Sequence, residues 1–107
     1  MFEVYRYQNE QGKEPLTEWL AGFRDRMVQA RLRLRLKRLE AGNFGDWEPV
    51  GEGVLELREH FGPGYRIYCG RHGKQVVILL CGGDKKTQAR DIDQAHRYWQ
   101  DWKRRQT

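Results

Sequence analysis

The sequence predicts an α+β domain with the element order β-α-α-β-β-β-α. Three observations predict this class: an opening segment that alternates like a strand, two early segments with helical apolar spacing, and three later β-rich segments divided by glycine turns. With 107 residues, the chain is long enough to bury a core and short for two domains, so residues 1–107 are predicted to form one domain. We expect a small, mostly antiparallel sheet with the helices packed on one face.

The first half of the chain is predicted to contain one strand and two helices. Residues 2–7 alternate apolar and polar side chains, as an edge strand does. Pro15 suits a first helical turn, and apolar residues then recur at i, i+3, i+4 and i+7 over residues 16–23. Residues 26–40 include a run that alternates Arg and Leu, but apolar spacings of three and four over the whole segment favour a helix capped by Asp25.

The second half is predicted to form the sheet. Residues 54–61, 65–71 and 74–81 are expected strands, because each is rich in leucine, β-branched or aromatic residues. Gly62-Pro63-Gly64 and His72-Gly73 are expected turns between them.

Glycine-rich segments are predicted to bound this sheet. Residues 45–53 are expected to form a loop, and Gly82-Gly83-Asp84 is expected to end the last strand. Thr87 then caps a closing helix that has one apolar row and a basic C-terminal end.

The two cysteines fall in predicted strands. Pairing these strands about the His72-Gly73 turn places Cys69 opposite Val76 and Cys81 near Gly64, too far apart for a disulfide. We therefore expect two buried, reduced thiols. Neither has a second cysteine at zinc-ligand spacing, so no metal site is predicted.

The chain is strongly basic. It has 20 Lys and Arg against 15 Asp and Glu, a net charge of +5 and a pI of about 9.5. This excess favours an acidic partner such as nucleic acid, although a basic surface that only keeps the protein soluble explains the charge equally well. No apolar run is long enough to span a membrane, and no signal peptide pattern opens the chain. We expect a cytoplasmic protein with no membrane partner.

Strand alternation is predicted to gather polar side chains on one face of the sheet. Glu56 and Arg58 alternate with leucines on one strand, and Arg66 and Tyr68 alternate with apolar residues on the next. These side chains would share the face that the helices leave open. His60 is in step with Arg58 on that face.

This face has the residue types that chemistry on a phosphodiester needs. Arginine clamps a phosphate through its bidentate fork, histidine exchanges a proton, and tyrosine stacks on a base. Lys85 and Lys86 follow the last strand and can reach the same surface. The candidate catalytic residues are Arg66, Arg58, Lys85, Lys86 and His60, and the candidate RNA-binding residues are Tyr68, Tyr65, Arg31, Arg35 and Arg38.

Structural roles compete with each of these assignments. Arg58 and Arg66 can pair with Glu56 and Glu59 across strands. The tyrosines can be packing residues, the two lysines a solvated turn, and the basic side of the second helix a solvated face or partner surface. His60 alone is a weak general base. The residues by themselves leave both interpretations open.

Two blocks of sequence carry a resemblance to a known family. Residues 57–68, Leu-Arg-Glu-His-Phe-Gly-Pro-Gly-Tyr-Arg-Ile-Tyr, and residues 80–88, which contain Gly-Gly-Asp-Lys, resemble the phage-derived, HigB-like toxins of the RelE/ParE superfamily, also called addiction-module killer proteins. Asp91-Ile92 extends the second block, and the similarity runs over nearly the whole chain. It implies a RelE/ParE-like fold with helices on one face of a small sheet.

The resemblance also implies a function. Such proteins are toxins of type II toxin–antitoxin systems, which cleave messenger RNA, commonly on the ribosome, without a metal or cofactor, and are neutralised by a co-encoded helix-turn-helix antitoxin. Arg66 matches the sheet arginine that contacts the scissile phosphate in related toxins. Arg58 matches a basic position on the neighbouring strand, and Lys85 or Lys86 matches the basic position after the last strand.

Departures from the family pattern leave alternatives open. Glu56 stands where some relatives carry lysine, and His96 and Tyr98 lie well inside the closing helix, whereas many relatives place an acid or base near the C-terminus. The general acid and base are therefore unassigned. A gyrase-inhibiting toxin of the ParE type and a non-catalytic RNA-binding or partner-binding module of the same fold are the alternative functions.

Overall fold

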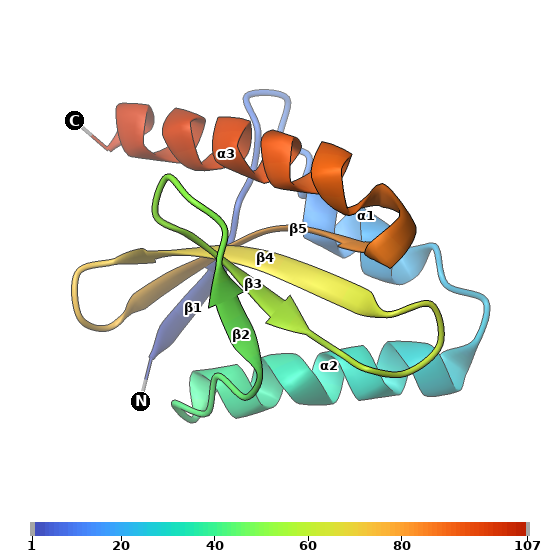
Figure 1. Cartoon of the computed structure of the whole chain (residues 1–107). Helices are drawn as coiled ribbons and strands as arrows, with labels where there is room; N and C mark the ends of the chain where they lie inside the picture. The colour runs from blue at the N-terminus through green and yellow to red at the C-terminus, as the bar shows by residue number, and fades with distance from the viewer. Residues whose placement is uncertain (1, 107) are drawn as a thin grey trace.

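A computed structural model describes residues 2–106, and a five-stranded mixed sheet forms its centre (Figure 1). The elements in chain order are β1 (Glu3–Arg6), α1 (Pro15–Ala21), α2 (Arg26–Glu40), β2 (Trp47–Pro49), β3 (Val54–Arg58), β4 (Tyr65–His72), β5 (Val76–Asp84), the 3-10 helix η1 (Lys85–Thr87) and α3 (Gln88–Arg105). The strands lie in the order β1-β5-β4-β3-β2, with β1 parallel to β5 and every other pair antiparallel. The predicted α+β class and the edge position of the first strand are confirmed. Among residues 2–106, no helix is long and apolar enough to cross a lipid bilayer.

Helices cover both faces of the sheet, so the prediction that they pack on one face is wrong (Figure 1). Leu32 and Leu57 belong to the core between the sheet and α1 and α2. Tyr68 and Trp99 belong to a second core, between the sheet and α3. Consecutive residues of β5 enter both cores. A strand that is apolar on both sides requires a cover on each, and α3 supplies the second.

Two glycines allow the helices to approach the sheet closely. A β-carbon on Gly70 of β4 would lie 2.5 Å from the ring of Trp99 in α3, and one on Gly82 of β5 would lie closer still to the ring of Trp19 in α1. Neither position can accept a side chain without displacing a tryptophan. The glycines therefore set the spacing of both helix layers.

Gly70→Ala is expected to lower the free energy of unfolding by about 2–3 kcal/mol, because Trp99 must leave its packed position. Gly22 is the matched control: its φ is negative and its β-carbon would meet only ordinary contacts, the nearest at 3.5 Å. Gly22→Ala should change stability by less than about 0.5 kcal/mol. Urea unfolding measures both variants, and equal, small effects would contradict the close packing of α3 on β4.

Boundaries agree with the sequence at α2 and differ in the sheet. α2 spans Arg26–Glu40 as predicted, and the Asp25 carboxylate caps it by accepting from the amides of Met27 and Val28. The predicted loop at 45–53 contains the edge strand β2, and β5 continues through the predicted break at 82–84. Gly82 and Gly83 do not end the strand. Their lack of a side chain leaves room for the Trp19 ring and the Asp91 carboxylate, respectively.

The pairing of β4 with β5 also differs from the prediction. Cys69 pairs with Leu79 and not with Val76, while Cys81 pairs with Tyr68, because the turn is longer than expected and the ladder shifts between residues 68 and 69. Both thiols are free and buried, as expected. They are separated by the sheet itself, since Cys69 lies in the α1–α2 core and Cys81 in the α3 core.

Candidate functional site

The four polar side chains predicted to share a sheet face do share it. Glu56 pairs with Tyr68, and Arg58 pairs with Arg66, on one antiparallel ladder. The face is not open, however, because α3 covers it. Glu56 and Tyr68 are fully buried, and Arg66 is only 7 % exposed. The predicted open face is therefore wrong, and this set reaches solvent mainly at its end, where the Arg58 side chain is partly exposed.

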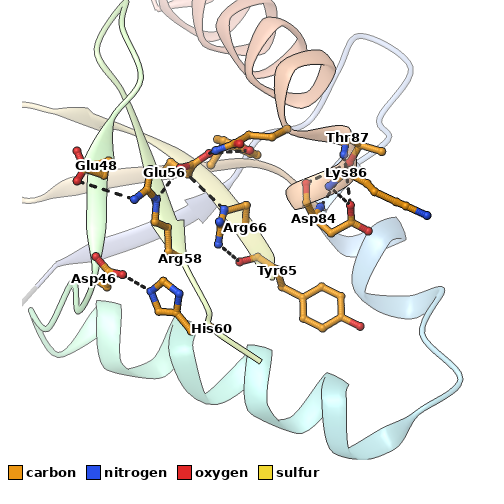
Figure 2. A network of polar contacts seen from close by, with 12 residues as sticks. Asp46, Glu48, Glu56, Arg58, His60, Tyr65, Arg66, Asp84, Lys86 and Thr87 are labelled. Atoms are coloured by element: carbon orange, nitrogen blue, oxygen red, sulfur yellow. Dashed lines mark hydrogen bonds and ion pairs between the residues drawn. The ribbon is translucent and has the colours of Figure 1, made fainter. Parts of the chain in front are cut away.

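Glu56 joins these residues into one network (Figure 2). Its Oε1 accepts a 2.9 Å hydrogen bond from Arg58 Nε and lies 4.0 Å from Arg66 Nε. Its Oε2 accepts from the Tyr68 hydroxyl at 3.0 Å and from the Gln88 amide at 2.8 Å. Burial raises the pKa of Glu56, but the hydrogen bonds from Gln88, Arg58 and Tyr68 outweigh it, so the pKa lies below its ordinary value. This buried anion therefore holds the Arg58 guanidinium, lies near that of Arg66, and ties α3 to β3 through Gln88.

Arg66 keeps hydrogen-bonding capacity that the protein does not use. Its Nη1 donates a weak 3.4 Å bond to the Tyr65 carbonyl, and its buried Nε has no hydrogen-bond partner among residues 2–106. The separation from Glu56 is also long for a charge pair. An incompletely paired, buried guanidinium is costly, so this group is a candidate for binding an anion.

Lys85 and Lys86 belong to η1, directly before α3, and Figure 2 shows Lys86 beside Asp84 and Thr87. The Asp84 carboxylate accepts from the amides of Lys86 and Thr87 and so fixes the turn that carries both lysines. Thr87 is the N-cap residue of α3, as predicted, but its side chain makes no capping hydrogen bond; its hydroxyl accepts from the Asp84 amide and donates to the Asp91 carboxylate. A β-carbon on Gly64 would lie 3.5 Å from Lys85 Cβ and 3.8 Å from Arg66 Nη1, so the base of the Lys85 side chain lies near the Arg66 guanidinium. Both lysines are exposed.

His60 lies past the end of β3, where its Nε2 contacts the carboxylate of Asp46 (Figure 2). This hydrogen bond lowers the pKa of Asp46. The Asp46 backbone is fixed, because its carbonyl accepts from the Arg58 amide at 2.9 Å and from Arg35 Nη2 at 2.6 Å. The sequence pattern indicated His60 but not Asp46. The partnership depends on β2, which was predicted as loop.

Two predicted RNA-binding residues lie in the interior. The ring of Tyr68 is enclosed in the α3 core, its hydroxyl is bonded to Glu56, and burial raises its pKa. No face of that ring is free to stack on a base. Arg35 is 5 % exposed, and its guanidinium donates to Glu59 and to three backbone carbonyls. Both side chains hold the fold together, and neither lies where RNA could reach it.

The other three predicted RNA-binding residues lie away from the Glu56 network. Tyr65 packs on the α1–α2 side, with its ring 6.2 Å from Trp19 and 5.2 Å from Phe61. The Arg31 guanidinium of α2 stacks over Phe61 at 3.7 Å from the ring centre. Arg38 is exposed on α2. Arg31 and Arg38 thus lie on α2, and the Tyr65 ring packs on the sheet face opposite Arg66, although the Tyr65 carbonyl accepts from Arg66.

Glu56→Gln is expected to lower the free energy of unfolding by about 2 kcal/mol at pH 7, because two guanidiniums lose their buried anion while the side-chain volume is kept. The folded-state pKa of Glu56 lies below its unfolded value. Its carboxylate therefore stabilises the fold above the unfolded pKa, and this contribution is lost as pH falls through the folded pKa.

Urea unfolding of wild type and Glu56→Gln should accordingly give stabilities that differ at pH 7 and converge at an acidic pH below the folded-state pKa of Glu56. Glu18→Gln, at an exposed position on α1, is the matched control and should differ little from wild type at either pH. A difference between wild type and Glu56→Gln that does not change with pH would contradict an ionised, stabilising Glu56.

Comparisons with known proteins cover most of the chain. Residues 18–100 match the family model described as "Phage derived protein Gp49-like (DUF891)". A protein of Haemophilus influenzae (strain ATCC 51907 / DSM 11121 / KW20 / Rd), described as "Uncharacterized protein", is 48 % identical over 77 residues, which is 72 % of this chain and 78 % of that protein. The matched residues run from α1 into α3 and include the whole Glu56 network.

Proposed function

The chain belongs to the Gp49-like family of phage-derived proteins, a RelE/HigB-type toxin-like group, and from this membership we propose that it is the toxin of a type II toxin–antitoxin system. In this proposal the protein acts in the cytoplasm, cleaves messenger RNA on the ribosome and blocks translation. A helix-turn-helix antitoxin binds and neutralises it. The RNA's own 2′-hydroxyl is the nucleophile, so no metal or cofactor takes part.

The observation that carries the proposal is the Arg58–Arg66 pair, in which one guanidinium reaches solvent and the other keeps an unpaired N–H. The 2′-oxygen loses its proton and bonds to the adjacent phosphorus, the bond from phosphorus to the 5′-oxygen of the next nucleotide breaks, and that oxygen takes up a proton. Negative charge builds on the phosphoryl oxygens during this exchange. Guanidinium groups held in place before the reaction stabilise that charge. Lys85 and Lys86 form no ion pair within residues 2–106, so both can meet neighbouring phosphates.

His60 supplies the proton-transfer group in this proposal, and Asp46 orients it. A carboxylate on one ring nitrogen fixes the direction of the imidazole and leaves the other ring nitrogen free to exchange a proton. His60 is exposed and can therefore reach a bound RNA. It follows Arg58 by two residues along the chain, so the acid–base group and the charge clamp lie at the same end of the sheet.

Primer-extension mapping of cellular transcripts after induction tests the proposal. An endoribonuclease produces new 5′ ends inside coding regions before any DNA-damage response. A gyrase inhibitor induces the damage response first and leaves transcripts uncut. A non-catalytic module binds RNA with a steep dependence on salt and also leaves transcripts intact. Uncut transcripts in arrested cells would overturn the cleavage assignment.

A further inference from the structure

The outer face of α2 carries an exposed apolar stripe between two rows of cations. At 3.6 residues per turn, Met27, Ala30, Leu34 and Ala41 fall along one line, and all four are exposed. Met27 is 73 % exposed and Leu34 is 47 % exposed. The flanking cations are Arg26, Arg33 and Lys37 on one side of the stripe and Arg31 and Arg38 on the other.

A shallow groove follows this face toward the start of the chain. Three hollows of about 380, 210 and 360 Å³ all include Lys37. The first is lined by the stripe residues Ala30 and Leu34, and the other two bring in Arg6 and Phe2 from the segment around the edge strand β1. The groove therefore has mainly apolar and cationic walls, with the carboxylate of Glu40 at the end that adjoins Arg6 and Phe2.

The positive charge of this face is not neutralised within the protein. None of the five flanking cations forms an ion pair with another residue in 2–106. Glu40 is the only carboxylate in α2, at its last residue. The Arg31 guanidinium contacts the Phe61 ring, which is uncharged and therefore does not neutralise it. An acidic partner would gain ion pairs here without breaking any.

We propose that this face binds an acidic, amphipathic helix of a protein partner. The side chains of Met27 and Leu34 would be buried against the partner's apolar stripe and so removed from water. The cation rows would pair with carboxylates on both sides of that stripe, as the flanking positions of a coiled coil do. RNA phosphates would use the cations but gain little from the exposed apolar side chains, so the combination favours a protein. The inference rests on the proposed function only for the partner's identity, because an antitoxin would supply such a helix.

A designed peptide of about 18 residues, or five helical turns, tests this chemistry. It carries leucines at i, i+3, i+4 and i+7 and glutamates elsewhere, and the comparison peptide has the same composition in scrambled order. NMR titration of the 12.8 kDa protein should show saturable binding of the ordered peptide with shifts on α2 amides. Leu34→Ser and Lys37→Glu should each weaken that binding about tenfold. Arg97→Glu, on the exposed side of α3, is the control and should change the affinity little.

Three results would overturn the inference. The first is no binding of the ordered peptide, or shifts confined to other elements. The second is equal affinity for the ordered and scrambled peptides, which would mean that charge alone acts. The third is a single-stranded RNA whose binding is weakened by Lys37→Glu while peptide binding is not. None of these measurements needs RNA cleavage or growth arrest, so failure here is distinguishable from failure of the proposed function.

Discussion

Arg66→Ala is expected to abolish growth arrest while leaving a folded protein. Removing the guanidinium takes away the buried, incompletely paired group that we assign to the scissile phosphate. Loss of one preorganised charge donor typically lowers a rate about 10²–10³-fold. Arg66→Lys should restore little activity, because an ammonium group cannot present the two-pronged donor of a guanidinium.

The fold should survive this change, because Glu56 keeps three hydrogen bonds, from Arg58, Tyr68 and Gln88. Urea unfolding should show a loss of about 1 kcal/mol. Arg97→Ala removes an exposed arginine that pairs with Asp93 at 3.0 Å and should leave arrest intact. Full growth arrest by Arg66→Ala would remove this residue from the site.

The salt dependence of RNA affinity is a second measurement. It would not change in Arg66→Ala if Arg66 had a purely structural role. If Arg66 neutralises one phosphate, the slope of log affinity against log salt should fall by about one in Arg66→Ala. An unchanged slope in a folded variant would place the phosphate contact elsewhere.

The sequence predicted the helical and strand pattern well, because local spacing determines it. The bounds of α2 follow from apolar spacing, the Asp25 cap and the glycine beyond its end. Alternation on β3 and β4 correctly placed Glu56 and Arg66 on one face. The arrangement of layers was missed, although its signal was present. A last strand that is apolar on both sides and a closing helix with one apolar row together indicate a helix on the second face.

Parts of the candidate site could not be predicted because they depend on contacts between distant segments. β2 has three exposed residues, one of them Pro49, and shows no alternation, so nothing local indicated that Asp46 would reach His60. Arg35 is different. It lies three residues after Leu32 and four before Leu39, both buried, so helical spacing already placed it on the inner face of α2. It was nevertheless predicted to bind RNA because of its positive charge.

Arg35→Met is expected to destabilise the fold by about 3–5 kcal/mol. The substitution removes a buried guanidinium donor and leaves acceptor oxygens around it without that hydrogen bond. Arg35 Nη1 donates to the Arg58 carbonyl at 2.9 Å and to Glu59 at 3.0 Å. Its Nη2 donates to the carbonyls of Phe44 and Asp46 at 2.7 and 2.6 Å. Methionine fills similar volume but donates nothing, so the carbonyls of Arg58 and Phe44 and the carboxylate of Glu59 lose this donor, while the Asp46 carbonyl keeps only the Arg58 amide.

The same contacts link α2 to the candidate site, so the variant should also lose activity if it folds. The Asp46 carbonyl accepts from both Arg35 and the Arg58 amide, and its side chain holds His60. Arg38→Met, one turn further along α2 on its exposed side, is the matched control and should change stability by less than about 0.5 kcal/mol. Thermal unfolding followed by circular dichroism compares the two. Similar midpoints for both variants would mean that the buried guanidinium is not what joins α2 to the end of β3.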